Sequence, residues 1–140
     1  MRIVICGSLK FYGEMVQIKE ALEKLGHLAE TPVKVRGVNY WAEGRSEMVQ
    51  KKRRAKRNLR LIDEHFRKIG KADAILVVNE TKKRIKNYIG ANTFAEMVYA
   101  HFLKRKIYLL NPIPNQKYIL DEIWAINPAV IGRDLRKIPI

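Results

Sequence analysis

A carboxylate near the start of a predicted helix is the residue best placed to do chemistry in this chain. Glu96 follows Thr93 by three positions, where a polar loop turns into the helix. The loop follows an apolar run, residues 72–79, that is typical of a buried strand. In an open α/β sheet, the loops that follow the carboxyl ends of the strands line the ligand crevice. A carboxylate in that crevice can act as a nucleophile or hold a ligand.

The same two residues also fit a purely structural pattern. In a capping box, a Thr hydroxyl accepts from the third helical amide and a Glu three residues later returns to the N-cap amide. Thr93 and Glu96 have this spacing. A carboxylate bonded to its own N-cap amide is not free to attack, so the two interpretations exclude each other and the sequence leaves both open.

The elements around Glu96 alternate between strands and helices. Short apolar runs predict strands at residues 2–6, 27–33, 74–78, 107–110 and 129–131. Helical spacing of apolar residues predicts helices at residues 13–25, 45–69, 93–103 and 117–126. The helix over 45–69 carries one apolar stripe, formed by Ala55, Leu59, Ile62, Phe66 and Ile69.

This alternation predicts one α/β domain over residues 1–140, a Rossmann-like or flavodoxin-like three-layer sandwich. Right-handed crossovers favour a mostly parallel five-stranded sheet in the order 2-1-3-4-5. The loops after the first and third strands then meet at the switch point of the sheet. The predicted crevice contains Gly7, Ser8, Tyr12, Asn79, Gly90, Asn92, Thr93 and Glu96.

The chain is strongly basic, with 28 Lys and Arg against 14 Asp and Glu and a net charge of +14. Such a charge favours polyanions or phosphorylated small molecules. One run of the predicted helix could contact the phosphates of a nucleic acid; it contains Lys51, Lys52, Arg53, Arg54, Lys56 and Arg57. The alternatives are a solvated helix face or a dock for an acidic partner, and the run lacks a known nucleic-acid-binding motif.

The cysteine and the histidines argue against a disulfide framework and a metal site. The lone cysteine, Cys6, cannot form an internal disulfide and ends a predicted buried strand. Together with the three histidines it shows no metal-ligand spacing, so we expect no metal site. His65 lies one position off the apolar stripe and is expected at the surface or in an interface. Tyr40 and Trp41 are candidates for stacking on a base or lining an oligomer contact.

Membrane insertion is not expected from the sequence. No apolar run approaches the ~18–20 residues that span a bilayer. The apolar start of the chain is too short for a signal peptide. We therefore expect a cytoplasmic protein with no membrane partner.

Three segments together resemble the nucleoside 2-deoxyribosyltransferase-like superfamily, which includes the 2'-deoxynucleoside 5'-phosphate N-hydrolases. The opening Ile5-Cys6-Gly7-Ser8 is similar to the hydrolase branch. The strand ADAILVVN and the segment NTFAEMVYA at residues 92–100 resemble the family pattern Gly-Thr-x-x-Glu-x-Gly-x-Ala and the strand before it. The following KRKIYLL is similar to the family's continuation into a strand.

The resemblance implies a reaction for the predicted crevice. Glu96 would be the nucleophile that attacks C1' of a deoxyribose and expels the base, and Tyr12 would orient its carboxylate. Ser8 and neighbouring backbone amides would hold a 5'-phosphate. Water would complete a hydrolysis and a second base would complete a transfer. No organic cofactor is implied, the partner is a nucleoside or nucleotide, and relatives suggest a homo-oligomer.

The sequence departs from the family pattern at three positions. A family Asp just before the Gly-Thr is not evident, and Asn87 or Tyr88 stands in its region. Asn79 stands where the family has an Asp that helps to protonate the leaving base, with Glu80 next to it. Asn92 replaces the glycine before the threonine, although Gly90 lies two residues earlier. These departures favour a second hypothesis, a non-catalytic nucleotide sensor of the same fold. The third hypothesis is the basic nucleic-acid binder.

Overall fold

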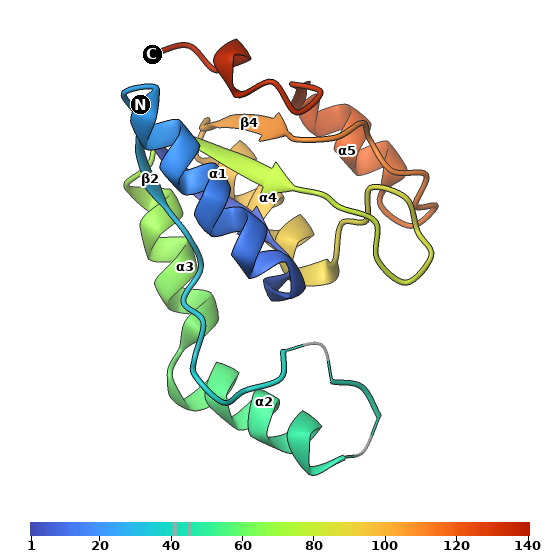
Figure 1. Ribbon diagram of the computed structural model, residues 1–140. Coiled ribbons are helices and arrows are strands. Elements are labelled where there is room, and N and C mark those ends of the chain that lie inside the picture. Colours follow the sequence, from blue (N-terminus) through green and yellow to red (C-terminus); the bar gives the residue numbers. More distant parts are fainter. Residues whose placement is uncertain (41, 45) are drawn as a thin grey trace.

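The computed structural model describes residues 1–40, 42–44 and 46–140. Their strands are β1 (Arg2–Gly7), β2 (Leu28–Glu30), β3 (Ala74–Val78), β4 (Lys106–Leu109) and β5 (Ala129–Val130). Their helices are α1 (Tyr12–Lys24), α2 (Glu47–Asn58), α3 (Leu61–Gly70), α4 (Ala91–Phe102) and α5 (Leu120–Ile126), with 3-10 turns η1 (Leu9–Phe11) and η2 (Leu135–Lys137). The strands form one sheet in the order 2-1-3-4-5, and every pairing is parallel, which confirms the predicted fold (Figure 1).

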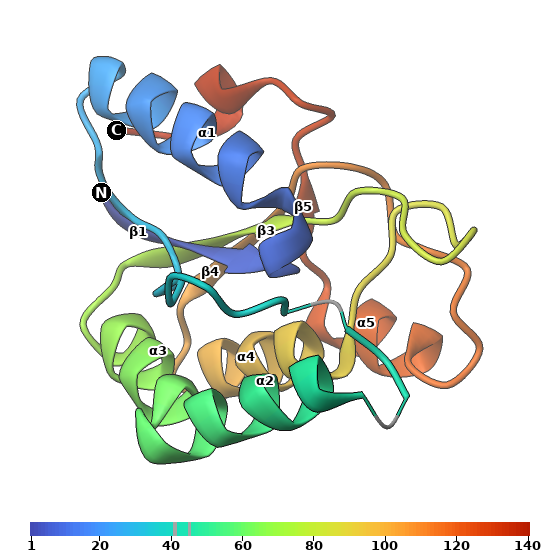
Figure 2. The ribbon, with the colours of Figure 1, turned by 60° about the horizontal axis from the view of Figure 1, so that its bottom comes forward.

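The sheet lies between two layers of helices. Figure 2 shows α1 and the C-terminal segment on one face, and α3, α4 and α5 on the other. β1 serves both layers, because Ile3 and Ile5 belong to the core under α1 while Val4 and Cys6 belong to the core under α3 and α4. All five residues of β3 are buried, as expected for the central strand of a sheet covered on both faces.

The prediction of a single long helix over residues 45–69 is wrong, because the helix is interrupted between α2 and α3. Arg60 adopts a left-handed conformation with φ 50°, which no helix interior accommodates. The apolar stripe does not face one core: Leu59 and Ile62 are about half exposed, at 54% and 49%, whereas Ile69 is buried. Consequently α3 packs on the sheet layer, and α2 extends beyond the sheet (Figure 1).

The start of α4 decides between the two interpretations of Thr93 and Glu96. The N-cap is Gly90, and Thr93 is the third residue of the helix rather than its cap. Glu96 therefore lies in the second turn, too far along the helix to reach back to the N-cap amide. The capping-box interpretation is wrong, and the Glu96 carboxylate is available for another role.

Gly7 connects β1 to the loop that follows, and its backbone requires glycine. Its φ is +149°, and an added Cβ would lie 2.9 Å from the Val78 carbonyl oxygen and 2.9 Å from the Met15 Cε atom. The carbonyl belongs to the central strand and cannot move aside, so a side chain here must distort the junction of β1 and β3.

We predict that Gly7→Ala lowers the free energy of unfolding by about 2–4 kcal/mol, from overpacking and backbone strain together. Gly13→Ala is the matched control, because an added Cβ at Gly13 meets nothing within 4 Å. Gly13 lies in α1, where alanine is preferred by about 0.5–1 kcal/mol. Urea denaturation of both variants measures the difference, and equal stabilities would show that the junction tolerates a side chain.

The helices also bear on membrane insertion. Among the described residues, no helix has both the length and the apolar composition that crossing a membrane requires.

Candidate active site

A cavity of about 230 Å³ opens where β1 and β3 end and α4 begins. One part of its wall comes from the sheet ends and the helices packed on them: Gly7, Ser8, Leu9, His65, Lys82, Tyr88, Gly90, Ala91, Asn92, Thr93 and Glu96. The other part comes from the segment between β2 and the first turn of α3: Pro32, Val33, Tyr40, Lys56, Leu61 and Ile62. The cavity therefore combines a rigid floor with a wall built from an irregular segment and α2.

Glu96 is held in this cavity by a histidine. Its side chain is almost fully buried, and its Oε2 atom lies 3.0 Å from Nε2 of His65 on α3. The Sγ atom of Cys6, at the end of β1, lies 3.5 Å from the same ring nitrogen. The carboxylate is thus positioned by groups from two other elements.

Burial favours the uncharged forms of this pair. It raises the pKa of Glu96 to about 8, an effect that the nearby Lys56 ammonium opposes. It lowers the pKa of His65 to about 4, and the charge of Lys68 adds to this. At neutral pH the Glu96 carboxyl therefore retains a proton and donates it to His65 Nε2. Ionisation of Glu96 is easiest when a positive charge is close to it.

The raised pKa of Glu96 makes stability depend on pH. A carboxyl whose pKa rises on folding contributes stability that is complete below its unfolded value, near 4.5, and is lost as the pH rises through about 8. We predict that wild type loses stability relative to Glu96→Gln between pH 6.5 and about pH 8, where His65 is uncharged in the folded protein and its titration in the unfolded chain is common to both proteins. Denaturation at several pH values, with a chelator present, measures this loss. A constant difference between the two proteins would contradict a raised pKa.

Another part of the cavity lining is suited to an anion. Lys82 Nζ donates a hydrogen bond to Ser8 Oγ at 3.0 Å. In α4 the Phe94 amide donates to the Gly90 carbonyl, so the amides before it, from Ala91 to Thr93, have no partner within the helix. A helix N-terminus next to an ammonium and a hydroxyl is a favourable position for a phosphate or carboxylate group.

Two tyrosines and a lysine complete the wall. Tyr88 lies beneath the Lys82 and Lys83 ammonium groups, 5.8 Å and 6.0 Å from its ring centre. The Tyr40 hydroxyl accepts from the Val35 amide at 2.8 Å, which fixes the ring at the cavity. Lys56 is half-buried, and burial lowers its pKa, with a further contribution from Lys52. Trp41, the other candidate for stacking on a base, lies outside the described residues.

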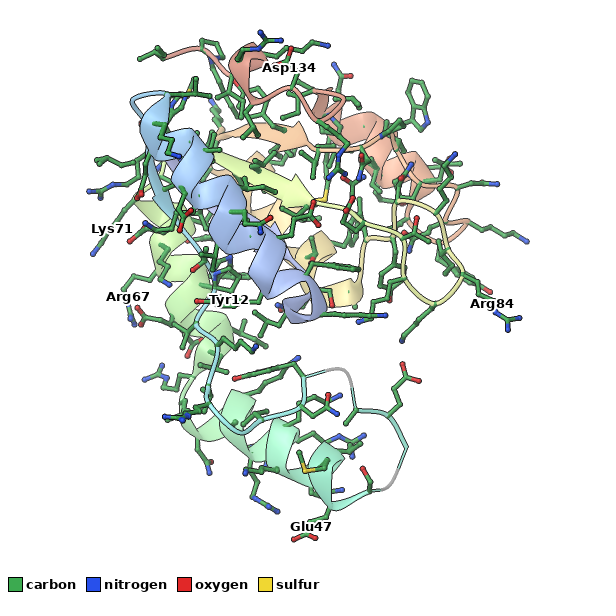
Figure 3. The ribbon with its side chains drawn as sticks, viewed as in Figure 1. Tyr12, Glu47, Arg67, Lys71, Arg84 and Asp134 are labelled. Carbon is green, nitrogen blue, oxygen red and sulfur yellow. The ribbon has the colours of Figure 1, made fainter. Side chains whose placement is uncertain are left out.

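The structure brings together six of the eight residues predicted from the sequence. Gly7, Ser8, Gly90, Asn92, Thr93 and Glu96 line the cavity, whereas Tyr12 and Asn79 are not among its described lining residues. Tyr12 starts α1, where its ring lies 5.4 Å below the Lys34 ammonium (Figure 3). The described contact to the Glu96 carboxylate comes from His65, where the sequence had suggested Tyr12.

Asn79 has a structural role at the end of β3. Its amide nitrogen donates to the Asn111 and Pro112 carbonyls at 2.9 Å and 3.1 Å, and its oxygen accepts from the Asn111 amide. These bonds join the ends of β3 and β4. Glu80, beside it, pairs with Arg133 at 2.7 Å. Neither side chain is directed at the cavity.

Three cavity residues were missed by the sequence reasoning: His65, Lys56 and Lys82. The expectation that His65 is at the surface is wrong, since it is 6% exposed. One signal was present, because His65 lies four residues before Ile69 and so shares its buried helix face. Lys56 belongs to the basic run, in which Lys52 is also partly buried while Lys51, Arg53, Arg54 and Arg57 are exposed. Binding of nucleic acid by these exposed side chains stays a prediction.

Cys6, His65 and Glu96 also form a group of metal-ligand atoms. One such atom from each residue lies within 4.8 Å of the others, and all three residues are buried. The expectation of no metal site rested on spacing along the chain. Spacing does not detect ligands from positions 6, 65 and 96 that meet only after folding.

Comparison with known proteins defines the fold. No family model matches the sequence, and no curated protein matches it significantly. Among solved structures, a 2-deoxyribosyltransferase from Bacillus psychrosaccharolyticus superposes with a TM-score of 0.60 at 15% identity, over 100% of this chain and 97% of that chain. The Clostridium botulinum CMP N-glycosidase BcmB superposes with a TM-score of 0.51 at 14% identity, over 94% of this chain and 87% of that chain.

The chain therefore shares the fold of these two proteins. Both neighbours are named for chemistry at the sugar of nucleosides or nucleotides. At such low identity the likeness concerns the fold, so the activity of this chain must be argued from its own cavity.

Proposed function

We propose that this protein cleaves or exchanges the N-glycosidic bond of a deoxynucleoside or its 5'-monophosphate, with Glu96 as the nucleophile. The observation that carries the proposal is the position of Glu96 in a cavity that also has an anion-binding side. A buried carboxylate that shares a cavity with groups suited to a phosphate fits a substrate that has both a reactive sugar carbon and a phosphate.

The chemistry follows from the charge that develops at the sugar. As the bond to the base breaks, C1' gains oxocarbenium character, which a carboxylate stabilises and then captures. Glu96 forms a covalent bond to C1' while the base departs with the bonding electron pair. Water or a second base then attacks C1', and the Glu96 carboxylate leaves.

Before attack, Glu96 must lose its proton. His65 is a poor acceptor for it, because burial lowers the pKa of His65 to about 4 while the pKa of Glu96 is about 8. The proton therefore leaves to solvent through the cavity, from the fraction of Glu96 that ionises near neutral pH. Lys56 increases that fraction by lowering the pKa of Glu96. A bound base and sugar also exclude water, which strengthens the attraction between Lys56 and the carboxylate. Formation of the nucleophile is thus an ionisation of Glu96, assisted by an ammonium group in the cavity wall.

The departing base also needs a proton. Asn79 carries no acidic proton, and Glu80 is paired with Arg133. Among the described residues that line the cavity, the titratable donors besides the Glu96–His65 pair are Lys56, Lys82 and the hydroxyls of Tyr40 and Tyr88. We assign this role to the wall that Lys56 and Tyr40 form, because Lys82 is bound to Ser8 on the phosphate side.

A nucleotide sensor of the same fold is the second candidate. It is favoured by the raised pKa of Glu96, because a protonated carboxyl can bind a ligand as a hydrogen-bond donor without attacking it. The Asn79 side chain is also engaged in hydrogen bonds at the end of β3, which fits a site that lacks a proton donor for the leaving base at this position. A sensor would bind the same ligands and leave them intact.

Release of free base from a substrate panel separates the two candidates. The purified protein is incubated with deoxynucleosides, ribonucleosides and their 5'-monophosphates, with and without a free acceptor base, and products are separated by chromatography. We expect release or exchange from at least one deoxynucleoside or its monophosphate. Binding by calorimetry without any turnover, from folded protein, would overturn the enzymatic proposal in favour of the sensor.

A further inference from the structure

We propose that Cys6, His65 and Glu96 form a binding site for a divalent transition-metal ion of the Zn²⁺ class. Their ligand atoms come from β1, α3 and α4 and lie within 4.8 Å of one another. The proposal does not require glycosidic activity, because metal binding depends only on these three side chains.

The spacing of the ligand atoms matches a metal polyhedron. In a tetrahedral zinc site, bond lengths of about 2.3 Å to sulfur and about 2.0–2.1 Å to nitrogen and oxygen place sulfur ~3.5 Å and oxygen ~3.3 Å from nitrogen. The observed separations are 3.5 Å between Cys6 Sγ and His65 Nε2 and 3.0 Å between His65 Nε2 and Glu96 Oε2. The third pair, Cys6 Sγ and the Glu96 carboxylate, lies within 4.8 Å, so an ion fits between the three side chains once these two groups close to the ~3.5 Å that a tetrahedral site requires.

The donor set selects the class of ion. A thiolate and an imidazole favour Zn²⁺, Co²⁺ and similar ions over Mg²⁺ or Ca²⁺, which prefer all-oxygen sites. One thiolate and one carboxylate also neutralise a divalent ion, which matters in a site where every ligand is buried. Binding releases to solvent the thiol proton and the proton shared by Glu96 and His65, because the ligands must be deprotonated.

The surroundings supply an orienting contact and an open position. The other ring nitrogen, His65 Nδ1, is directed at the backbone of Ile5, although it makes no hydrogen bond of normal geometry with the described residues. Metal-binding histidines use such a contact to fix the ring. His65 and Glu96 both line the cavity, so a fourth position faces it and can take water or a ligand atom.

The two cations near the site oppose binding without blocking it. Lys56 and Lys68 are the ammonium groups whose charges act on Glu96 and His65. Lys56 is half-buried at the cavity and Lys68 donates to the Thr31 carbonyl at 3.0 Å. Neither forms a described ion pair with the three ligands, so the ion displaces no existing salt bridge to a lysine.

A bound ion would also regulate the proposed reaction, and this consequence rests on the proposed function. Coordination occupies the Glu96 carboxylate, so it cannot attack C1'. Metal-loaded protein is then inactive in base release, and a chelator restores the activity. The binding test itself uses no substrate, so failure of one proposal is distinguishable from failure of the other.

Cobalt binding tests the site directly. The chelator-treated full chain is titrated with Co²⁺ while the near-ultraviolet thiolate-to-cobalt band and the visible bands of tetrahedral Co²⁺ are recorded, and Zn²⁺ is then added as competitor. We expect one equivalent to produce both bands and Zn²⁺ to abolish them. Cys6 is the sole cysteine of the chain, so the thiolate band reports on this site alone.

Variants assign the ligands. Cys6→Ser should remove the thiolate band and weaken Zn²⁺ binding by more than ~100-fold, because loss of outer contacts alone costs about 10–100-fold. Glu96→Gln should weaken binding as well and serves if Cys6→Ser does not fold. His101→Asn is the matched control, because His101 is exposed on α4 and should leave binding unchanged. A wild-type protein without either band, or with bands unchanged in Glu96→Gln, would overturn the proposal.

Discussion

Replacing Glu96 with Gln should reduce base release by ~10³-fold or more and leave nucleotide binding within a few-fold of wild type. The variant keeps the shape and burial of the side chain but removes the oxygen that bonds to C1', so the loss falls on the chemical step. Single-turnover base release measures that step, and calorimetry with the same nucleotide measures binding.

The matched control for this experiment is Glu20→Gln, an exposed carboxylate on α1. It makes the same chemical change, a carboxyl group to an amide, without touching the cavity and should leave turnover unchanged. Turnover by Glu96→Gln within about tenfold of wild type would show that the carboxylate is not the nucleophile. Loss of binding together with turnover would instead assign Glu96 to ligand recognition, as the sensor hypothesis requires.

Lys82→Met should weaken the use of 5'-monophosphates by ~10–100-fold in kcat/KM and change the use of unphosphorylated nucleosides little. A charge-assisted hydrogen bond contributes about 1.5–3 kcal/mol, which corresponds to that range. The ammonium already donates to Ser8 Oγ, so it is held in the lining of the cavity, to which the start of α4 also contributes, before any ligand binds. Steady-state kinetics on a nucleoside and its own monophosphate give the comparison.

Lys86→Met is the control, because Lys86 is an exposed lysine of the same loop. It tests whether the effect comes from the net positive charge of the protein or from Lys82 in particular. Figure 3 shows the neighbouring Arg84 projecting outward from this loop, so the loop also carries charge away from the cavity. An equal effect of both lysine variants would indicate general attraction of anions and no defined phosphate site.

The sheet could be predicted from the sequence because its strands are buried on both faces. Runs such as residues 74–78 are apolar without interruption, and this pattern together with alternating helices restricts the topology to few choices. Glu96 was identified for the same reason, since its place after β3 follows from the order of elements. Its exact environment did not follow, because Gly90 rather than Thr93 caps α4.

The rest of the site depends on contacts that the chain order does not show. The stripe from Ala55 to Ile69 continues through Arg60, so periodicity alone predicts one helix. The left-handed residue at Arg60 is what separates α2 from α3 and allows Lys56 to reach the cavity. His65 is separated from Glu96 by two loops and β3, and from Cys6 by α1, β2 and α2, and such long-range pairings leave no local trace in the sequence.

The division of the cavity wall has a consequence for how proteins of this design diversify. Every wall residue from Pro32 to Ile62 belongs to one continuous segment, whereas Glu96, Ser8 and the start of α4 belong to the sheet framework. Mutations, insertions or deletions in that segment alter the shape of the cavity without disturbing the strands. Selection can therefore change ligand specificity through mutations in this one segment of the chain. A laboratory library confined to the same segment would explore specificity while the framework stays intact.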